Sequence, residues 1–395
     1  MSEPIRQALI LAGGRGTRLG AITEAIPKPM LRIAGDKPFL DYLIEMIERH
    51  GYEDILLLGG YLGEVLEAAY DGRRIGRAKL RVLREKAPLG TAGALTIARE
   101  TLDPRFLMMN GDAFFDINLR ALEQAALEGG AMATLALRSV PDAARYGRVI
   151  EEQGKVVAFL EKDPSRPGPG IINGGIYVLK REILDLVSAL PCSLEQDIFP
   201  TLVERGQIRG KAFDGYFLDI GLPETLEQGH RELPEVRVRA AAFFDRRTLV
   251  GGGGDSGALQ WTTGAIEAIR ALNDRGYYVF VTSGGASDVS RLNAAMQAAL
   301  AREGAHVDRC YEGAAFASGP LSGSAGTPDS FARATDEWPI VREKTFFIGV
   351  ADDDVEAARR AGIPGHLSDG GDLARFVEGL LGQSALSTAD RANRS

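Results

Sequence analysis

Cysteine and histidine are scarce in this chain of 395 residues, which has two cysteines and four histidines. Cys192 and Cys310 lie far apart and match neither a zinc-binding spacing nor a disulfide framework. No window holds 18 consecutive apolar residues, and the polar start "MSEPIRQ" lacks the apolar stretch of a signal peptide. We therefore expect a cytoplasmic protein with no membrane partner.

Excess positive charge is also lacking. The formal net charge is -8 at pH 7, so the chain as a whole attracts neither nucleic acid nor anionic lipid. Any phosphate-bearing ligand must therefore be held by a local basic cluster. The length, with 45% hydrophobic residues, is enough for two cores, and we expect two domains.

The most informative stretch that is present is "QALILAGGRGTRLGAITEAIPKPM" near the start. Its apolar run Ala8–Leu11 is typical of a buried parallel strand that ends in a tight turn. The turn "GGRGTR" combines glycines, whose backbone N–H groups can approach an anion, with two arginines. This pattern indicates a phosphate loop, although the turn alone leaves open an ordinary glycine-rich loop with solvated arginines.

Apolar runs and helical patterns then alternate. The runs "DILLLGG", "KLRVLRE" and "RFLMMNGD" indicate buried strands, and residues 38–52 show helical spacing with Gly51 as a C-cap. The stretches "LGEVLEAAYDG" and "TAGALTIARETL" also indicate helices. Repeated β-α units predict a doubly wound sheet, with ligands beyond the carboxyl ends of its strands. Three turns lie at such ends: 13–18, 59–61 and 110–112.

A change in composition near 231–239 marks a domain boundary. A polar, proline-containing segment gives way to a new apolar strand over 240–244, and the β-α pattern then repeats. We predict one domain over 1–232, a second over 238–382, and a flexible tail over 383–395 because that end is small and polar.

The first half resembles the sugar-1-phosphate nucleotidylyltransferase family, and within it the D-glycero-α-D-manno-heptose 1-phosphate guanylyltransferase branch. The resemblance covers residues 7–230. It rests on "LAGGRGTRL", "PKPML", "PLGTAGAL", "NGDAFFDINL", "INGGIYVL" and "FDGYFLDIGLPE", in the order of the family. It implies a Rossmann-like mixed α/β sheet of the GT-A-like type. It also implies transfer of a nucleotidyl group from an NTP, GTP in this branch, to a sugar 1-phosphate.

The resemblance implies a role for each motif. Arg18 would stabilise the departing pyrophosphate and Lys28 would contact the transferring phosphates, its backbone held extended by Pro27 and Pro29. Asp112 and Asp219 would bind Mg²⁺ together. By itself, a carboxylate at the end of a strand is either a helix N-cap or a metal ligand. The expected nucleotide-binding residues are Leu11, Ala12, Gly13, Gly14, Gly16, Thr17, Gly90, Thr91 and Gly111.

The acceptor side follows from the same resemblance. The residues expected to hold the sugar phosphate are Tyr146, Gly147, Glu161, Lys162 and Asn173. One departure is Asp163, which replaces the family's usual proline and places a negative charge beside Lys162. No physical feature of "PLGTAGAL" separates guanine from the other bases, so guanine rests on the resemblance alone.

The second half resembles haloacid-dehalogenase-like phosphatases of the histidinol-phosphatase and heptose-bisphosphate-phosphatase type, which implies a smaller Rossmannoid domain. Its active set departs from that pattern. Asp245 stands at the nucleophile position, but Arg247 replaces the acid/base aspartate and Val350 replaces a late-motif aspartate, whereas Asp354 is kept. We expect a domain without hydrolytic activity.

The sequence thus predicts a Mg²⁺-dependent nucleotidyltransferase with an inert appended domain. Two alternatives stay open: an inactive sugar-phosphate-binding regulatory protein, and a bifunctional transferase and phosphatase. A homo-oligomer is also allowed, with the second domain as a source of interface.

Overall fold

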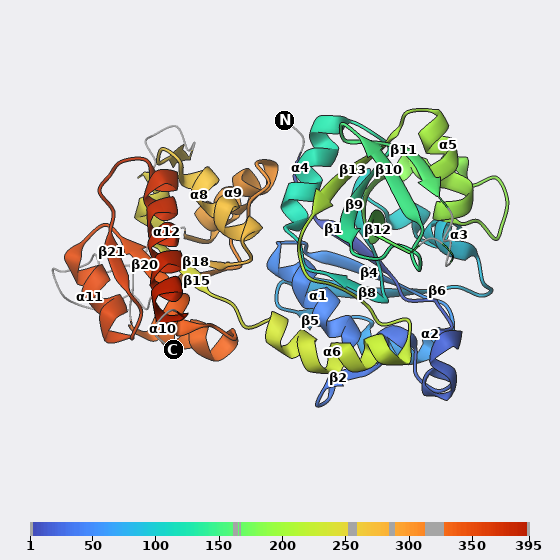
Figure 1. Ribbon diagram of the computed structural model, residues 1–395, viewed down its shortest axis with the longest axis horizontal. Coiled ribbons are helices and arrows are strands. Elements are labelled where there is room, and N and C mark those ends of the chain that lie inside the picture. Colours follow the sequence, from blue (N-terminus) through green and yellow to red (C-terminus); the bar gives the residue numbers. More distant parts are fainter. Residues whose placement is uncertain are drawn as a thin grey trace. The chain divides into compact units, whose positions relative to one another are not determined.

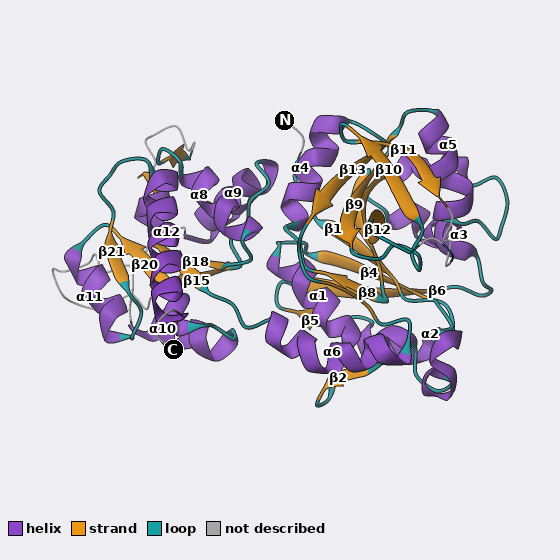
Figure 2. Cartoon of the chain, viewed as in Figure 1, coloured by secondary structure: helices purple, strands orange, loops and turns teal. Residues whose placement is uncertain are grey.

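The computed structural model describes residues 3–160, 165, 167–251, 259–283, 289–312 and 328–392. The chain divides into two compact units, Met1–Glu235 (unit 1) and Val236–Ser395 (unit 2), drawn in Figures 1 and 2. The division falls near the end of a helix, Pro223–Val236, so much of the segment 231–239 that we predicted as a linker is helical.

Unit 1 is built on a ten-stranded mixed sheet in the order β10-β11-β13-β9-β12-β7-β1-β4-β6-β5. Strands β6, β4, β1 and β7 are parallel neighbours, and β12 joins them antiparallel to β7. The mixed α/β sheet predicted from the sequence is therefore confirmed. The strands of unit 1 are β1 (Gln7–Leu11), β2 (Arg32–Ala34), β3 (Lys37–Pro38), β4 (Asp54–Gly59), β5 (Arg74–Ile75), β6 (Ala78–Arg84), β7 (Arg105–Asn110), β8 (Ala113–Phe115), β9 (Ala133–Val140), β10 (Arg148–Glu152), β11 (Lys155–Leu160), β12 (Gly170–Lys180), β13 (Ile208–Phe213) and β14 (Phe217–Asp219).

Helices cover the sheet because their apolar residues repeat at helical spacing. Helix α1 buries Phe39, Leu40, Leu43, Ile44 and Ile47, and ends before Gly51, whose φ of 84° confirms the predicted cap. The helices of unit 1 are η1 (Thr17–Thr23), η2 (Lys28–Met30), α1 (Phe39–Arg49), α2 (Gly63–Tyr70), α3 (Gly90–Leu95), η3 (Thr96–Thr101), α4 (Leu119–Gly129), η4 (Arg181–Leu186), η5 (Leu194–Ile198), α5 (Phe199–Glu204) and α6 (Pro223–Val236).

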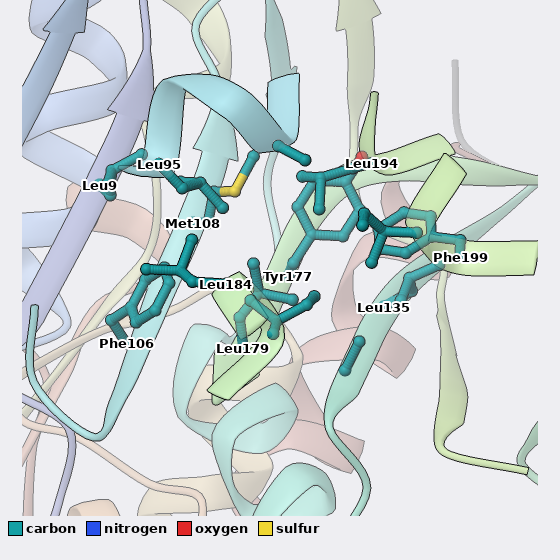
Figure 3. Packing of buried hydrophobic residues seen from close by; sticks show 14 of the residues in the cluster. Leu9, Leu95, Phe106, Met108, Leu135, Tyr177, Leu179, Leu184, Leu194 and Phe199 are labelled. Carbon is teal, nitrogen blue, oxygen red and sulfur yellow. The ribbon is translucent and has the colours of Figure 1, made fainter. Parts of the chain in front are cut away.

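One core cluster of unit 1 joins strands and helices that lie far apart in sequence. Figure 3 shows Leu9 of β1, Met108 of β7 and Tyr177 of β12 packed in the same cluster as Leu95 of α3 and Phe199 of α5. Each such leucine is fully buried and contributes about 1.5–3 kcal/mol. The cluster holds α3 and the segment of η5 and α5 against the sheet, beside the ends of β1 and β7.

Unit 2 is a five-stranded parallel sheet in the order β19-β18-β15-β20-β21. Its elements are β15 (Ala241–Asp245), α7 (Arg246–Leu249), β16 (Val250–Gly251), β17 (Gln260–Trp261), α8 (Ala265–Asp274), β18 (Tyr278–Ser283), α9 (Val289–Arg302), β19 (Arg309–Glu312), α10 (Pro328–Glu337), η6 (Arg342–Lys344), β20 (Phe346–Gly349), α11 (Asp352–Arg360), β21 (Gly365–Leu367) and α12 (Leu373–Ala392).

Both faces of this second sheet are buried. Phe244 packs with residues of α8, α9 and α12, whereas its neighbour Phe243 packs with residues of α10 and α11. This alternation is the reason why β15 is apolar throughout until Asp245. The carboxylate therefore emerges at the carboxyl end of a central strand.

Two local predictions differ from the structure. The stretch "TAGALTIARETL" forms α3 followed by the 3-10 segment η3 rather than one α-helix. Helix α12 continues to Ala392 through most of the predicted flexible tail, while 393–395 lie outside the described residues. Among the helices of the described ranges, none combines the length and apolar character needed to cross a membrane.

Candidate active site

A cavity of about 530 Å³ lies at the carboxyl ends of β1, β4, β6 and β7 in unit 1. Neighbouring parallel strands end at the same edge of the sheet, so the loops that follow them surround one space. The residues that line the cavity are Leu11, Gly13, Gly14, Arg15, Lys28, Pro29, Gly60, Tyr61, Glu85, Lys86, Ala87, Pro88, Gly90, Thr91, Ala94, Asn110, Gly111 and Asp112.

The glycine loop after β1 needs its glycines for two reasons. Gly60 lies in the neighbouring loop, which follows β4. A Cβ on Gly60 would lie 2.8 Å from the carbonyl oxygen of Gly13, so the loops after β1 and β4 can approach this closely only because Gly60 has no side chain. Gly16 has a φ of 63°, a left-handed conformation that other residues rarely adopt. Beside this loop, the guanidinium of Arg15 lies 5.7 Å from the ring centre of Tyr61. The loop thus brings backbone and fixed positive charge to the wall of the cavity.

Lys28 is buried rather than solvated, with 9% of its side chain exposed. Our expectation of an extended backbone at Lys28 is wrong, because the residue begins the 3-10 turn η2. Met30 N–H donates to the carbonyl of Pro27, and Leu31 N–H to that of Lys28. Pro29 has no N–H to lose, so it is tolerated inside this first turn. The turn directs the ammonium group toward Asp112.

Asp112 and Asp219 are brought together by a small antiparallel sheet of β8 and β14. Asp219 is paired in register with Ala113, and Ile220 N–H donates to the carbonyl of Asp112. Lys28 Nζ lies 2.8 Å from Asp112 Oδ2 and 3.9 Å from Asp219 Oδ1. Burial raises the pKa of Asp219, and the nearby charge of Asp112 raises it further, against the opposing effect of Lys28.

The donor set at this place suits a magnesium ion. Two carboxylates and one ammonium leave a net negative charge at this place. Burial raises the pKa of Asp219, and the charge of Asp112 adds to that shift. Within the described ranges, no cluster of three or more His, Cys, Asp or Glu could hold a metal by itself. Mg²⁺ usually takes one or two carboxylates and completes its octahedron with water and substrate phosphates. Asp112 and Asp219 fit that description.

The predicted nucleotide-binding residues divide into two groups. Leu11, Gly13, Gly14, Gly90, Thr91 and Gly111 line the cavity, whereas Ala12, Gly16 and Thr17 lie outside its lining. Arg18 is exposed in η1 and also lies outside the lining, but its charge acts on Asp219.

The hydroxyl of Thr91, one of the expected nucleotide-binding residues, already has two partners. It donates to Glu195 Oε2 at 3.0 Å and accepts from Leu194 N–H at 2.8 Å. These bonds fasten the start of α3 to η5. The side chain of Thr91 therefore has an evident structural task at the cavity wall.

The structure describes only some of the residues that we expect to hold the sugar phosphate. Tyr146 packs edge-on against Phe217, and burial together with the charge of Asp219 raises its pKa, so its ring lies near the carboxylate pair. Gly147, the next residue, has a φ of 74°. Glu161 and Lys162 lie outside the described residues.

The side chain of Asn173 is hydrogen-bonded within the protein. Its amide donates to the hydroxyl of Tyr177 at 2.8 Å, and its carbonyl accepts from Gly175 N–H. Burial raises the pKa of Tyr177 well above its ordinary value, with Glu195 and Asp112 adding to the shift. Asn173 therefore belongs to a network that reaches toward Asp112.

The sequence reasoning missed several residues of the cavity, among them Glu85 and Lys86. Tyr61 and Asn110 lie in two of the turns that the sequence predicts at strand ends, although no motif gives either residue a role. Glu85 follows β6, a strand that had also been predicted. The same rule, that ligands collect beyond strand ends, would have found it.

Unit 2 contains a second pair of acidic side chains around one cation. Asp245, at the end of β15, and Asp354, in α11, are both buried. Arg247 Nε donates to Asp245 Oδ2 at 2.9 Å, and its Nη2 donates to Asp354 Oδ2 at 2.6 Å. The guanidinium thus joins both carboxylates, and these bonds raise the pKa of Arg247, chiefly through Asp245.

Comparison with known proteins shows which family unit 1 resembles. The family model described as nucleotidyl transferase matches residues 7–236. D-glycero-α-D-manno-heptose 1-phosphate guanylyltransferase of Aneurinibacillus thermoaerophilus is 35% identical over 229 residues, which cover 58% of this chain and 98% of that protein. The catalytic subunit beta of mannose-1-phosphate guanylyltransferase from Xenopus tropicalis is 33% identical over 231 residues, covering 56% of this chain and 63% of that protein.

A solved structure gives the same result for the fold. HddC from Yersinia pseudotuberculosis, complexed with GMP-PN, superposes with a TM-score of 0.52 and 31% identity, covering 58% of this chain and all of that one. The glycine loop, the buried lysine and the paired aspartates lie within residues 7–236, which the family model matches. By its first unit, the chain belongs to the nucleotidyl transferase family.

Proposed function

We propose that unit 1 transfers GMP from GTP to a sugar 1-phosphate, namely D-glycero-α-D-manno-heptose 1-phosphate, and releases pyrophosphate. The observation that carries this proposal is Lys28, whose ammonium lies between two carboxylates at the wall of a cavity bounded by the glycine loop. The heptose relative, matched over 98% of its length, supports the choice of sugar and base. The mannose 1-phosphate relative makes that sugar the second candidate.

The chemistry explains this collection of charges. An oxygen of the sugar phosphate attacks the α-phosphorus of the nucleotide, and the bond from that phosphorus to the pyrophosphate oxygen breaks. The nucleophile is already an anion and needs no general base, so catalysis depends on positioning and on neutralising charge. Lys28 meets the phosphates from the cavity wall, and Arg18 stabilises the departing pyrophosphate from the exposed end of the loop.

The metal enters this proposal through Asp112 and Asp219. These two carboxylates would hold Mg²⁺, which, when bound, neutralises phosphate charge and acts as a Lewis acid. Their exposed fractions, 45% for Asp112 and 30% for Asp219, leave room for a phosphate-bound cation on their open side.

The acceptor would lie beside the same pair of carboxylates. Tyr146 and Asn173 belong to groups that reach Asp219 and Asp112, respectively, which supports a sugar site next to the reacting phosphates. We keep Glu161 and Lys162 as proposed sugar-phosphate ligands on the resemblance of "FLEK" to the family motif.

The proposal is tested by pyrophosphate release from the full chain with Mg²⁺, each of the four NTPs being crossed with heptose, mannose and glucose 1-phosphates. We expect the fastest turnover with GTP and the heptose. No turnover with any pair would favour the alternative of a regulatory protein that only binds sugar phosphates or nucleotides.

For unit 2 we infer a haloacid-dehalogenase-like domain that does not hydrolyse phosphate esters. The parallel sheet with Asp245 at the end of its central strand supports the fold. The position of Arg247 supports the lack of activity. Its guanidinium donates a hydrogen bond to the carboxylate of Asp245, which is the group that would have to attack the phosphorus.

A further inference from the structure

A buried tyrosine hydroxyl in unit 1 connects the wall of the cavity to the expected acceptor side. Tyr177 lies in β12 and is fully buried. Its hydroxyl accepts a hydrogen bond from the amide of Asn173 at 2.8 Å, and the amide of Asn110 also donates to it. Asn110 ends β7 and lines the cavity, whereas Asn173 is one of the residues expected to hold the sugar phosphate. The hydroxyl therefore holds together two amides that belong to different parts of the site.

The contact between Asn173 and Tyr177 depends on an irregularity in β12. The pairing of β12 with β9 shifts in register between these two residues. In a regular strand the Cα atoms of residues four apart lie about 13 Å from each other, whereas a bulge bends the strand and redirects its side chains. Gly175 inside this stretch has a φ of 75°, and a Cβ on Gly174 would lie 2.5 Å from Cδ1 of Phe115. The two glycines thus permit the bend that brings the amide to the hydroxyl.

Tyr177 is suited to hydrogen bonding and not to acid or base catalysis. Burial raises the pKa of its hydroxyl well above the ordinary value, and the negative charges of Glu195 and Asp112 add to that shift. The group therefore stays a neutral phenol around neutral pH. A phenol oxygen can accept two hydrogen bonds, which matches the two amides that donate to it.

Asn173 keeps part of its hydrogen-bonding capacity for a ligand. Within the described ranges its side chain donates to Tyr177 and accepts from Gly175 N–H. An amide has a second N–H and a second lone pair beyond those two bonds. Asn173 is half-buried, so a ligand can reach it. A sugar hydroxyl both donates and accepts, and it would match these two remaining groups.

We propose that Tyr177 is a positioning residue for the sugar 1-phosphate, because its hydroxyl holds the amide of Asn173 in a fixed direction relative to the end of β7. This inference rests on the proposed nucleotidyl transfer and adds to it a residue that organises the acceptor. Asp112 follows directly after the turn at the end of β7, so the same hydroxyl links the acceptor amide to the strand that leads to the proposed metal site. A sugar bound by Asn173 would thereby present its phosphate in one place relative to the nucleotide.

The test compares wild type with Tyr177→Phe in the full chain, using the NTP and the sugar 1-phosphate that wild type turns over fastest. Phenylalanine keeps the ring, whose centre lies 5.5 Å from that of Phe199, and removes only the hydroxyl. We expect the KM for the sugar 1-phosphate to rise about 10-fold, as for the loss of one or two neutral hydrogen bonds. The KM for the NTP should change by less than about 3-fold.

Tyr70→Phe is the matched control. Tyr70 is also buried in unit 1, and its hydroxyl donates to Asp41 at 2.7 Å, but it lies outside the lining of the cavity. Both variants lose one buried hydroxyl and should melt at a lower temperature than wild type. Only Tyr177→Phe should change the KM for the sugar 1-phosphate, so the comparison separates positioning from a general loss of stability.

A double-mutant cycle with Asn173→Ala shows whether Tyr177 acts through the amide. Asn173→Ala alone should raise the KM for the sugar 1-phosphate at least as much as Tyr177→Phe does. Adding Tyr177→Phe to Asn173→Ala should then raise that KM by less than about 2-fold, because no amide remains to be positioned. Full multiplication of the two effects would overturn the positioning role.

The remaining outcomes are distinct. An unchanged KM for the sugar 1-phosphate in Tyr177→Phe, with wild-type turnover present, would overturn the inference and leave the transferase in place. An equal rise in both KM values would indicate general damage to the site and would also overturn it. Absence of wild-type turnover with every NTP and every sugar 1-phosphate would overturn the proposed function itself, and this inference with it.

Discussion

Each of the two units holds a pair of aspartates around one basic side chain, and the two clusters differ in access. In unit 1, Asp112 and Asp219 are 45% and 30% exposed, and Lys28 makes a close contact with only one of them. In unit 2, Asp245 and Asp354 are 1% and 0% exposed, and the guanidinium of Arg247 bonds to both.

The difference shows how the choice of cation decides what an acidic pair can do. An ammonium is a compact point charge, and it leaves carboxylate oxygens available for a metal or for ligand donors. A guanidinium is planar and can donate to two carboxylates at once, so it completes the pair internally. The first cluster is therefore suited to binding and catalysis, and the second to holding β15 and α11 together.

The largest effect is expected from Asp112→Asn and Asp219→Asn. Each change keeps the shape of the side chain but removes a charge from the proposed Mg²⁺ site, and we expect turnover to fall by about 10³-fold or more. Steady-state pyrophosphate release, with thermal melting to check the fold, measures this. Asp103→Asn, at an exposed position, is the control. Near-wild-type turnover of either variant with Mg²⁺ would remove the shared metal site.

The next effect concerns the stability of unit 2. Arg247→Ala leaves two buried carboxylates without their cation, and we expect a loss of about 3 kcal/mol in the free energy of unfolding. That value is the lower end for a broken buried pair, because 43% of the Arg247 side chain is exposed. Both tryptophans, Trp261 and Trp338, belong to unit 2, so their fluorescence during denaturant unfolding reports on this unit.

The same variant also tests whether the two clusters are independent. Nucleotidyl transfer should be unchanged in Arg247→Ala, since no part of the proposed site lies in unit 2. Arg247→Lys should be more stable than Arg247→Ala but less stable than wild type. The reason is that an ammonium cannot reproduce the planar arrangement of N–H donors by which the guanidinium bonds to both carboxylates. Full stability in Arg247→Ala would mean that the ion pair contributes nothing to the fold.

A smaller effect is expected when the basic groups of unit 1 are removed. Lys28→Ala and Arg18→Ala should each reduce turnover by about 10²-fold, while the affinity for the NTP changes by less than about 10-fold. The reason is that these groups act most strongly on charge that develops during transfer. Arg99→Ala, which removes an exposed ion pair with Asp185, is the control. A loss confined to affinity would assign both residues to ground-state binding.

The smallest expected effect is none at all. The full chain should release no phosphate from an aryl phosphate or from heptose 1,7-bisphosphate, because Arg247 binds the carboxylate of Asp245 and itself stands at the position of the acid/base aspartate. Hydrolysis that disappears in Asp245→Asn would contradict this and would make the protein bifunctional.

Local signals made much of unit 1 predictable. The apolar run before Gly13, the spacing of α1 and the cap at Gly51 are all encoded by neighbouring residues, and each was found where the sequence indicated. The turn at Lys28 was missed because a lysine before proline favours extended backbone in general, whereas here hydrogen bonds from Met30 and Leu31 close a 3-10 turn.

What the sequence determined by itself was the family, the glycine loop and the presence of carboxylates at strand ends, since these depend on residue type and short spacing. Only the tertiary structure placed Asp219 beside Asp112, turned Glu85 into the cavity, and joined Arg247 to Asp354. These contacts depend on strand pairing and packing between distant segments. No local propensity encodes such a register, because it is chosen by burial of the whole core.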